Sequence, residues 1–176
     1  MKTARFLFVV AALLSIEAIN LTNGFPSFST LQSNYPSYST YDSDTGMVDH
    51  AGLRKWLYYK NTCAMRVSYA MIHSGHSISI SSGECNWSGV RAARASGSYY
   101  NKKYIIRVGT MRCYLEKTIG AATTGTQSDF SGHKGIIVFQ GCNFQVATGH
   151  VDLWDGSSCS GTCYFNSCNN VRLFKL

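Results

Sequence analysis

The stretch Asn61-Thr-Cys-Ala-Met-Arg-Val-Ser-Tyr-Ala-Met-Ile-His73 decides the fold, because its pattern predicts a helix with a cysteine in the first turn. Apolar side chains recur along it at helical spacing. Asn61 and Thr62 are residue types that often cap the start of a helix, and Gly75 is a typical stop after the last turn. We therefore expect one helix over residues 61–73, with Cys63 at or near its first residue.

Strands are predicted mainly in the second half of the chain. Residues 135–140 (Gly-Ile-Ile-Val-Phe-Gln) form a short, strongly apolar run that is typical of a strand buried on both faces. Residues 149–154 alternate apolar and polar positions like a half-buried strand, and we expect two more strands over 104–108 and 171–175. A short helix is expected over 53–59. Helices that precede strands indicate an α+β fold, with N-terminal helices packed on an antiparallel β-sheet.

The first residues have the features of a secretory signal peptide. Lys2 and Arg5 give a positive start, an apolar run follows over residues 6–16, and small residues come next. The run is too short for a membrane anchor, which takes about 20 residues. We expect residues 1–24 to be removed, with cleavage between positions 18 and 24. The mature protein is then secreted and extracellular, with no membrane span, in an oxidising compartment.

Residues 25–46 are rich in Ser, Thr, Tyr and Asn and lack apolar periodicity, so we expect a linker or a loosely held arm. One folded domain is predicted over 47–176. The chain of 176 residues, with 45% hydrophobic and 14% charged residues, is neither disordered, collagen-like nor a coiled coil. Its net charge of +7 favours anionic partners such as bacterial envelopes. The basic residues are scattered and form no nucleic-acid stripe.

Seven cysteines leave at least one thiol without an internal partner. Cys63 is the candidate nucleophile, because a helix start favours thiolate over thiol and its N–H groups can stabilise an oxyanion. The alternative is a buried structural cysteine or a disulfide partner. The remaining six can form three disulfides, in any of fifteen connectivities. Arg66, one turn further, is expected in a salt bridge or on the surface, with contact to a substrate carboxylate as the alternative.

Among the five histidines, His150 is the candidate base, because it lies on the 149–154 strand, on the face opposite Val151 and Leu153. A cysteine on a helix that faces a histidine on a strand is the arrangement of papain-like enzymes, and the chain order agrees. Asp152 projects to the same face and is the favoured orienting residue. Asp155 or a backbone carbonyl is the alternative. No His and Cys spacing matches a zinc site, so neither a metal nor another cofactor is predicted.

Residues 61–68 and 149–156 resemble the cysteine and histidine segments of the type VI secretion amidase effectors, family four, and residues 135–139 resemble the family's central strand. The similarity extends from about residue 47 to the C-terminus. It implies an NlpC/P60-like, papain-type fold. It also implies a peptidoglycan amidase that cuts between γ-D-glutamate and meso-diaminopimelate, with Cys63 as nucleophile and His150 as base. Bacterial peptidoglycan is the implied partner; an inhibitor of the immunity type is not implied by the sequence.

Two features depart from that family. A third catalytic aspartate is expected between two cysteines after the histidine strand, but here the loop reads Cys159-Ser-Gly-Thr-Cys163, with Gly161 in its place. The resemblance implies a Cys159–Cys163 disulfide. The signal peptide is the second departure and suggests antibacterial use outside the producing cell. Three alternatives remain: a cell-wall-binding module without strong catalysis, a cysteine enzyme acting on another amide or ester, and a structural protein in which Cys63 is bonded.

Overall fold

The structure is a computed structural model that describes residues 24–81, 83–92, 100–145 and 147–176. The signal peptide predicted over residues 1–24 therefore lies, except for its last residue, outside the described part. Within the described residues, no helix is both long and apolar enough to cross a membrane.

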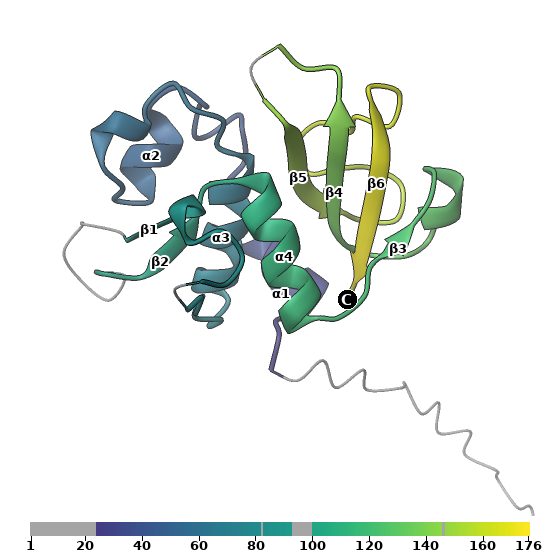
Figure 1. Cartoon of the computed structure of the whole chain (residues 1–176), viewed down its shortest axis with the longest axis horizontal. Coiled ribbons are helices and arrows are strands. Elements are labelled where there is room, and N and C mark those ends of the chain that lie inside the picture. The colour runs from purple at the N-terminus through teal and green to yellow at the C-terminus, as the bar shows by residue number, and fades with distance from the viewer. Residues whose placement is uncertain (1–23, 82, 93–99, 146) are drawn as a thin grey trace, which may run out of the picture.

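The helices come mostly in the first two thirds of the chain (Figure 1). Among the described residues four are α-helical: α1 (Phe28–Ser33), α2 (Gly46–His50), α3 (Cys63–His73) and α4 (Val108–Thr118). Three single 3₁₀ turns accompany them: η1 (Lys55–Leu57), η2 (Trp87–Gly89) and η3 (Ser128–Phe130). The expected helix over 61–73 is thus present from Cys63 onward, and Gly75 follows it with a positive φ of 88° that suits glycine.

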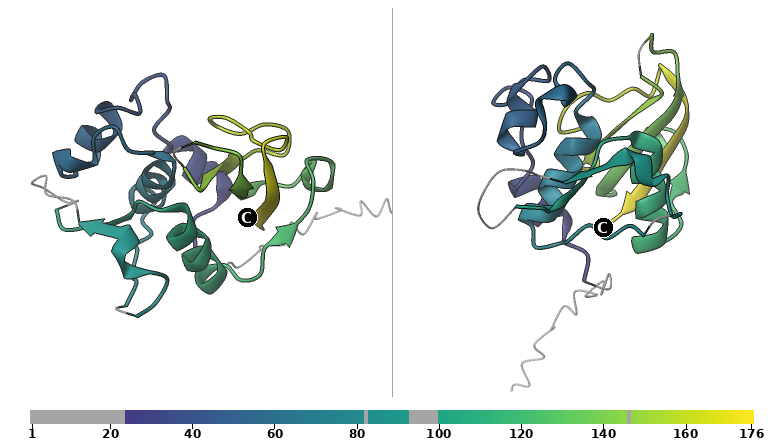
Figure 2. Two further views of the ribbon diagram at one scale, coloured as in Figure 1. Left: turned by 45° about the horizontal axis from the view of Figure 1, so that its top comes forward. Right: turned by 60° about the vertical axis from the view of Figure 1, so that its left-hand side comes forward.

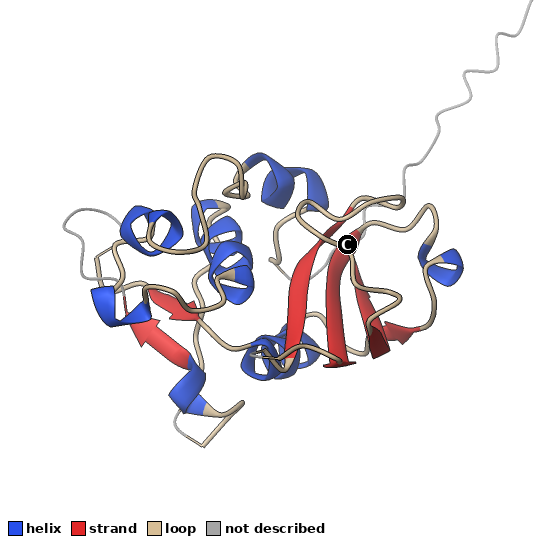
Figure 3. Ribbon diagram, turned by 90° about the horizontal axis from the view of Figure 1, so that it is seen from above, coloured by secondary structure: helices blue, strands red, loops and turns tan. Residues whose placement is uncertain are grey.

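In the part of the chain that the structure describes, the strands form two antiparallel sheets. A small one pairs β1 (Val90–Ala92) with β2 (Lys103–Ile105). The main sheet has the order β3-β6-β4-β5 and contains β3 (Thr123–Thr124), β4 (Gly135–Cys142), β5 (Gly149–Trp154) and β6 (Cys168–Lys175). The helices lie beside this sheet, as Figure 3 shows from above and Figure 2 from two other sides. The α+β class with an antiparallel sheet is confirmed.

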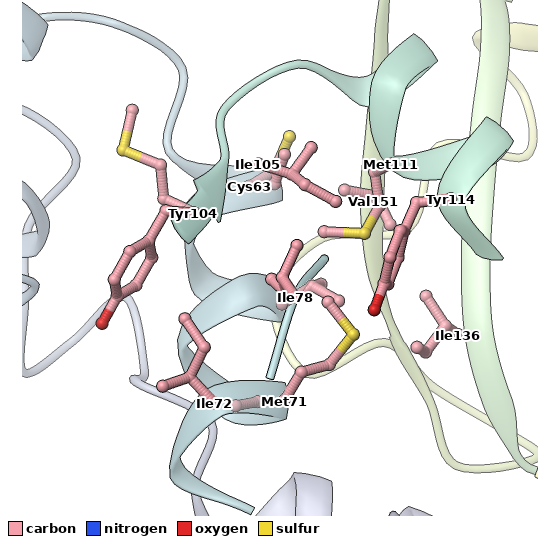
Figure 4. Packing of buried hydrophobic residues seen from close by; sticks show 14 of the residues in the cluster. Cys63, Met71, Ile72, Ile78, Tyr104, Ile105, Met111, Tyr114, Ile136 and Val151 are labelled. Atoms are coloured by element: carbon pink, nitrogen blue, oxygen red, sulfur yellow. The ribbon is translucent and has the colours of Figure 1, made fainter. Parts of the chain in front are cut away.

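Each face of the main sheet carries a cluster of buried apolar side chains. One face packs against the helices, where Met71, Met111, Tyr114, Ile136 and Val151 come together between α3, α4 and the sheet (Figure 4). The opposite face carries its own cluster, formed by Phe130, Ile137, Phe139, Trp154, Val171 and Leu173 and covered by the segment that follows β5. All six residues of β5 are buried. The prediction that the strand over 149–154 is only half buried is therefore wrong. The segment that follows β5 covers the face that was expected to be exposed to solvent.

The segment 25–46 is not the loosely held arm or linker that its composition predicted. It carries α1, and its Phe25, Phe28 and Leu31 lie in the main core. Its polar main chain is held by Arg66, which is 0% exposed. The guanidinium donates hydrogen bonds to the carbonyls of four residues of the segment: Pro36, Ser37, Tyr41 and Asp42. Arg66 therefore has neither the surface position nor the salt bridge expected from the sequence.

The expected strand over 104–108 ends early, and the sequence pattern did not predict the helix α4 that follows it. β2 stops at Ile105, and Val108 opens the helix after the extended residue Arg107. Gly109 and Thr110 are weak helix formers, so the first turn gives little sequence signal. The helix over 53–59 is only the 3₁₀ turn η1.

The cysteines divide as six bonded and one free. The disulfides are Cys85–Cys113, Cys142–Cys168 and Cys159–Cys163, and Cys63 is the free, buried thiol. Cys85–Cys113 ties the loop before β1 to α4, and Cys142–Cys168 joins paired positions of β4 and β6. The pairing implied for Cys159 and Cys163 is confirmed, and the alternative of a disulfide-bonded Cys63 is wrong.

Candidate active site

Cys63 is the first residue of α3, and its side chain is 1% exposed. Its backbone N–H donates to Oδ1 of Asn61 at 3.0 Å, so Asn61 satisfies one of the free donors at the helix start. Thr62 makes no capping bond with its side chain; its hydroxyl accepts from Nε of Arg66 instead. Cys63 therefore stands in the first turn of α3, at the positive end of the helix dipole.

His150 lies on β5 with two ionisable neighbours. Its Nε2 is 3.4 Å from Oδ2 of Asp152, and the free Cys63 lies close enough to the ring to act on its pKa. Burial alone would lower the pKa of His150, but interactions with Asp152 and Cys63 outweigh this and raise the pKa to about 9. The ring of Tyr164 packs edge-on at 4.9 Å and closes one side of the imidazole.

Asp152 is 0% exposed, and both of its carboxylate oxygens accept hydrogen bonds. Oδ1 accepts from the backbone N–H of Leu153 at 2.8 Å, and Oδ2 accepts from that of Gly161 at 2.7 Å. A Cβ added at Gly161 would lie 2.8 Å from Oδ2 of Asp152 and 2.5 Å from the Tyr38 ring. Only glycine therefore fits at position 161 while the Asp152 carboxylate occupies this space.

Asp155, the alternative orienting residue, is engaged elsewhere. Its carboxylate accepts from the backbone N–H groups of Ser157 and Ser158 in the turn after β5. The backbone hydrogen bond from Ser158 is the main reason that the pKa of Asp155 is lowered to about 2. The structure thus brings Asp152, and not Asp155, to the imidazole.

Two tyrosines of the 25–46 segment lie close to the candidate catalytic residues, although this segment was expected to be a linker or a loosely held arm. Burial, followed by the nearby Asp152, raises the pKa of Tyr35, whose buried hydroxyl has no hydrogen-bond partner within normal distance in the described structure. Burial, followed by Cys63 and Asp152, raises the pKa of Tyr38. The Arg66 guanidinium lies 3.7 Å above the Tyr38 ring. In the sequence these residues are marked only by their spacing, since Tyr35, Tyr38 and Tyr41 stand three positions apart.

Two hollows meet at the candidate site. One, of about 420 Å³, is lined by Cys63, and the other, of about 580 Å³, is lined by His150. Asn61 and Ala147 line both, so the two hollows adjoin at these two residues, and the pair of hollows is called the cleft below. A larger hollow of about 840 Å³ lies at Thr124, Trp154 and Asn166. Its lining contains no acid, base or free thiol, so the chemistry belongs to the cleft.

The other histidines lie away from the cleft. His50 stacks on Tyr41, His73 on Tyr69, and His76 contacts Phe25 and Tyr114, while His133 is exposed. Among the residues that the structure describes, no cluster of three or more His, Cys, Asp or Glu side chains is able to hold a metal ion.

Comparison with known proteins identifies the family. Residues 59–174 match the family model described as "Type VI secretion system (T6SS), amidase effector protein 4". The structure is similar to an effector from Salmonella typhimurium crystallised with an immunity protein from Enterobacter cloacae, with TM-score 0.66, 32% identity, and coverage of 86% of this chain and 99% of that one. It is also similar to the type VI effector from Enterobacter cloacae, with TM-score 0.60, 27% identity, and coverage of 86% and 96%. No curated protein sequence matches the chain. The chain therefore belongs to the family of type VI secretion system amidase effector protein 4.

Proposed function

We propose that the protein is a secreted, antibacterial peptidoglycan amidase that cleaves the stem peptide between γ-D-glutamate and meso-diaminopimelate through a cysteine–histidine mechanism. Membership of an amidase effector family supports the reaction class. The observation that carries the proposal is the position of the buried His150, which lies 3.4 Å from the Asp152 carboxylate and close enough to the free Cys63 for that residue to raise its pKa. The NlpC/P60-type fold is part of the proposal.

In the proposed mechanism Cys63 reacts as a thiolate and His150 as an imidazolium. A His150 pKa of about 9 keeps the ring protonated near neutral pH, so it can serve as the proton donor. The thiolate attacks the amide carbonyl carbon, and a C–S bond forms as electrons move onto the oxygen. The imidazolium gives its proton to the leaving nitrogen as the C–N bond breaks. Water, deprotonated by the neutral imidazole, then hydrolyses the thioester and regenerates the thiolate.

The oxyanion is held by Asn61. From the helix start one would expect the Cys63 N–H to serve, but that group already donates to Oδ1 of Asn61. This bond fixes the Asn61 side chain at the middle of the cleft, and its Nδ2 makes no hydrogen bond in the described structure. A fixed amide donor next to the attacking sulfur is the kind of group that stabilises a developing oxyanion.

Asp152 orients the imidazole and balances its charge. The space that an aspartate at position 161 would enter is filled by the Asp152 carboxylate, which Gly161 binds through its backbone. The alternative of a catalytically weak binding module rested on the missing aspartate, so this substitution of one carboxylate for another removes its main support.

The three disulfides support the proposal that the protein is secreted. Three disulfides persist in an oxidising compartment and would be reduced in most cytosols. The predicted signal peptide supplies the export route. Peptidoglycan is the expected partner in that compartment.

The proposal is tested with muropeptides of defined structure. Mass spectrometry should find a fragment that ends in γ-D-glutamate and a second that begins with a free diaminopimelate amine. Casein, incubated in parallel, should stay intact. Cleavage of casein, or fragments cut at another bond, would contradict the proposed specificity.

A further inference from the structure

The two hollows of the cleft carry different charges, and catalysis fixes which half of the substrate each receives. The acyl carbon bonds to the Cys63 sulfur, so the acyl half lies in the hollow that Cys63 lines. The leaving nitrogen takes its proton from His150, so the leaving half lies in the hollow that His150 lines. This assignment rests on the proposed function.

Apart from the catalytic Cys63, the acyl-side hollow has one charged lining residue, the exposed Arg107. Arg107 stands at the N-cap of α4, and its Nη1 donates to the Ser88 hydroxyl at 3.2 Å. A guanidinium has five donors, so most remain available for a carboxylate. The lining side chains other than Cys63 and Arg107 are neutral, and the first turn of the eleven-residue α4 adds positive potential. This hollow suits an anionic acyl group.

The leaving-side hollow contains both signs of charge. Asp44 and Lys60 line it together with Tyr38, Tyr59 and Tyr164. The Asp44 carbonyl accepts from the N–H of Tyr59 at 2.8 Å, which ties the loop that carries Asp44 to the residue before Lys60. No ion pair within 4.0 Å joins the two side chains in the described residues, so both charges face the hollow unpaired with each other. This side suits a group with one ammonium and one carboxylate.

We infer that Arg107 binds a free carboxylate on the acyl half of the substrate, and that Asp44 and Lys60 bind a zwitterionic side-chain end on the leaving half. The α-carboxylate of a γ-linked D-glutamate meets the first requirement. The distal amine and carboxylate of meso-diaminopimelate meet the second. The cleft therefore selects its bond through opposite charge patterns on the two sides of the Cys63–His150 pair.

The acyl side is tested with two stem tetrapeptides that differ only in the D-glutamate α-carboxylate, free in one and amidated in the other. Wild-type kcat/KM should favour the free acid by about tenfold, the size expected for a charge-assisted bond at an exposed arginine. Arg107→Gln should bring the ratio of the two values close to one. Lys175→Gln removes the same charge at an exposed position on the far end of β6 and should keep the tenfold ratio.

The leaving side is tested by replacing diaminopimelate with L-lysine, which keeps the distal amine but lacks its carboxylate. Wild-type enzyme should prefer diaminopimelate, and Lys60→Gln should remove most of that preference. Asp44→Asn should lower kcat/KM for both the diaminopimelate and the lysine peptide, because each keeps the distal amine. An unchanged preference in Lys60→Gln would overturn the leaving-side assignment.

Failure of the inference is distinguishable from failure of the proposed function. If wild-type enzyme cuts the peptides but Arg107→Gln lowers kcat/KM for the free-acid and the amidated peptide equally, the charge assignment is wrong and the amidase proposal stands. If wild-type enzyme cuts neither peptide, the amidase proposal fails. Binding of both peptides to Cys63→Ala, measured by calorimetry, then decides the inference by itself. A preference for the free acid that Arg107→Gln abolishes supports it, and equal binding overturns it.

Discussion

The backbone N–H of Gly161 donates a 2.7 Å hydrogen bond to Oδ2 of Asp152, the same oxygen that lies 3.4 Å from Nε2 of His150. A side chain at position 161 would collide with this oxygen and with the Tyr38 ring. The carboxylate beside the imidazole therefore comes from the histidine strand itself, and the loop closed by Cys159–Cys163 contributes a backbone donor.

Gly161→Ala should impair catalysis without unfolding the protein. Its Cβ would push Asp152 or Tyr38 aside, and misplacement of an orienting group by about 1 Å costs roughly 10²-fold in rate. Steady-state kinetics on muropeptides measures the loss. Ser160→Ala, at the exposed neighbouring position, is the matched control and should behave as wild type. Full activity of Gly161→Ala would mean that Asp152 has no positioning role.

The activity should fall at alkaline pH as His150 loses its proton. The pKa of about 9 predicts a decline of kcat/KM through that value, because the leaving amine then has no proton donor. In Asp152→Asn the decline should begin at lower pH, since one of the bonds that raise the pKa is weakened. A pH–rate profile of both proteins measures this, and a wild-type decline centred near pH 6.5 would contradict it.

The imidazole of His150 also makes the stability of the fold depend on pH. Because the folded-state pKa of His150 is raised above its ordinary value of 6.5, its stabilising contribution is fully present below about pH 6.5 and is lost as the pH rises through about 9. The free energy of unfolding, followed by urea denaturation, should therefore decrease over that range. His150→Gln should lose most of this decrease, and an identical pH dependence in the variant would count against the link.

Asn61→Asp separates the two functions of Asn61. The aspartate keeps an oxygen that can accept from the Cys63 N–H, so α3 should begin normally, but it lacks the Nδ2 donor. We expect kcat to fall about 10²- to 10³-fold, the usual effect of removing an oxyanion donor, with little change in melting temperature. Circular dichroism and kinetics together test this. A variant that keeps its kcat would exclude Asn61 from the oxyanion site.

Arg66→Met should destabilise the fold by about 3 kcal/mol or more. It leaves the carbonyls of Pro36, Ser37, Tyr41 and Asp42 without their donor in a largely buried setting. The segment before α2 should become sensitive to limited proteolysis. Arg54→Met, at an exposed position, should change stability by less than about 0.5 kcal/mol. Equal stability of both variants would contradict this structural role.

The sequence predicted the elements whose signals are local. Helical spacing after Asn61 gave α3, and the apolar run after Gly135 gave β4. The odd cysteine count predicted at least one unpaired thiol, and the helix-start position made Cys63 the candidate, which the structure shows to be free. The structure also brings Cys63, His150 and Asp152 together, because α3 carries the cysteine and β5 carries the other two to the same edge of the sheet.

What the sequence did not predict depends on contacts between distant residues. The burial of residues 25–46 requires Arg66 to satisfy main-chain carbonyls about 30 positions earlier, and no local pattern encodes that. Tyr35 and Tyr38 join the site for the same reason. The full burial of β5 depends on the segment carrying Tyr164 and Phe165, which folds back over the sheet.

The central claim is that Cys63 performs the hydrolysis of peptidoglycan. Its most direct test is digestion of purified sacculi by wild-type protein and by Cys63→Ala, followed by mass spectrometry of the released muropeptides. We predict cleavage at the γ-D-glutamyl–diaminopimelate bond by the wild type and none by Cys63→Ala, which should retain the wild-type fold by circular dichroism. Cleavage at that bond by folded Cys63→Ala would contradict the account.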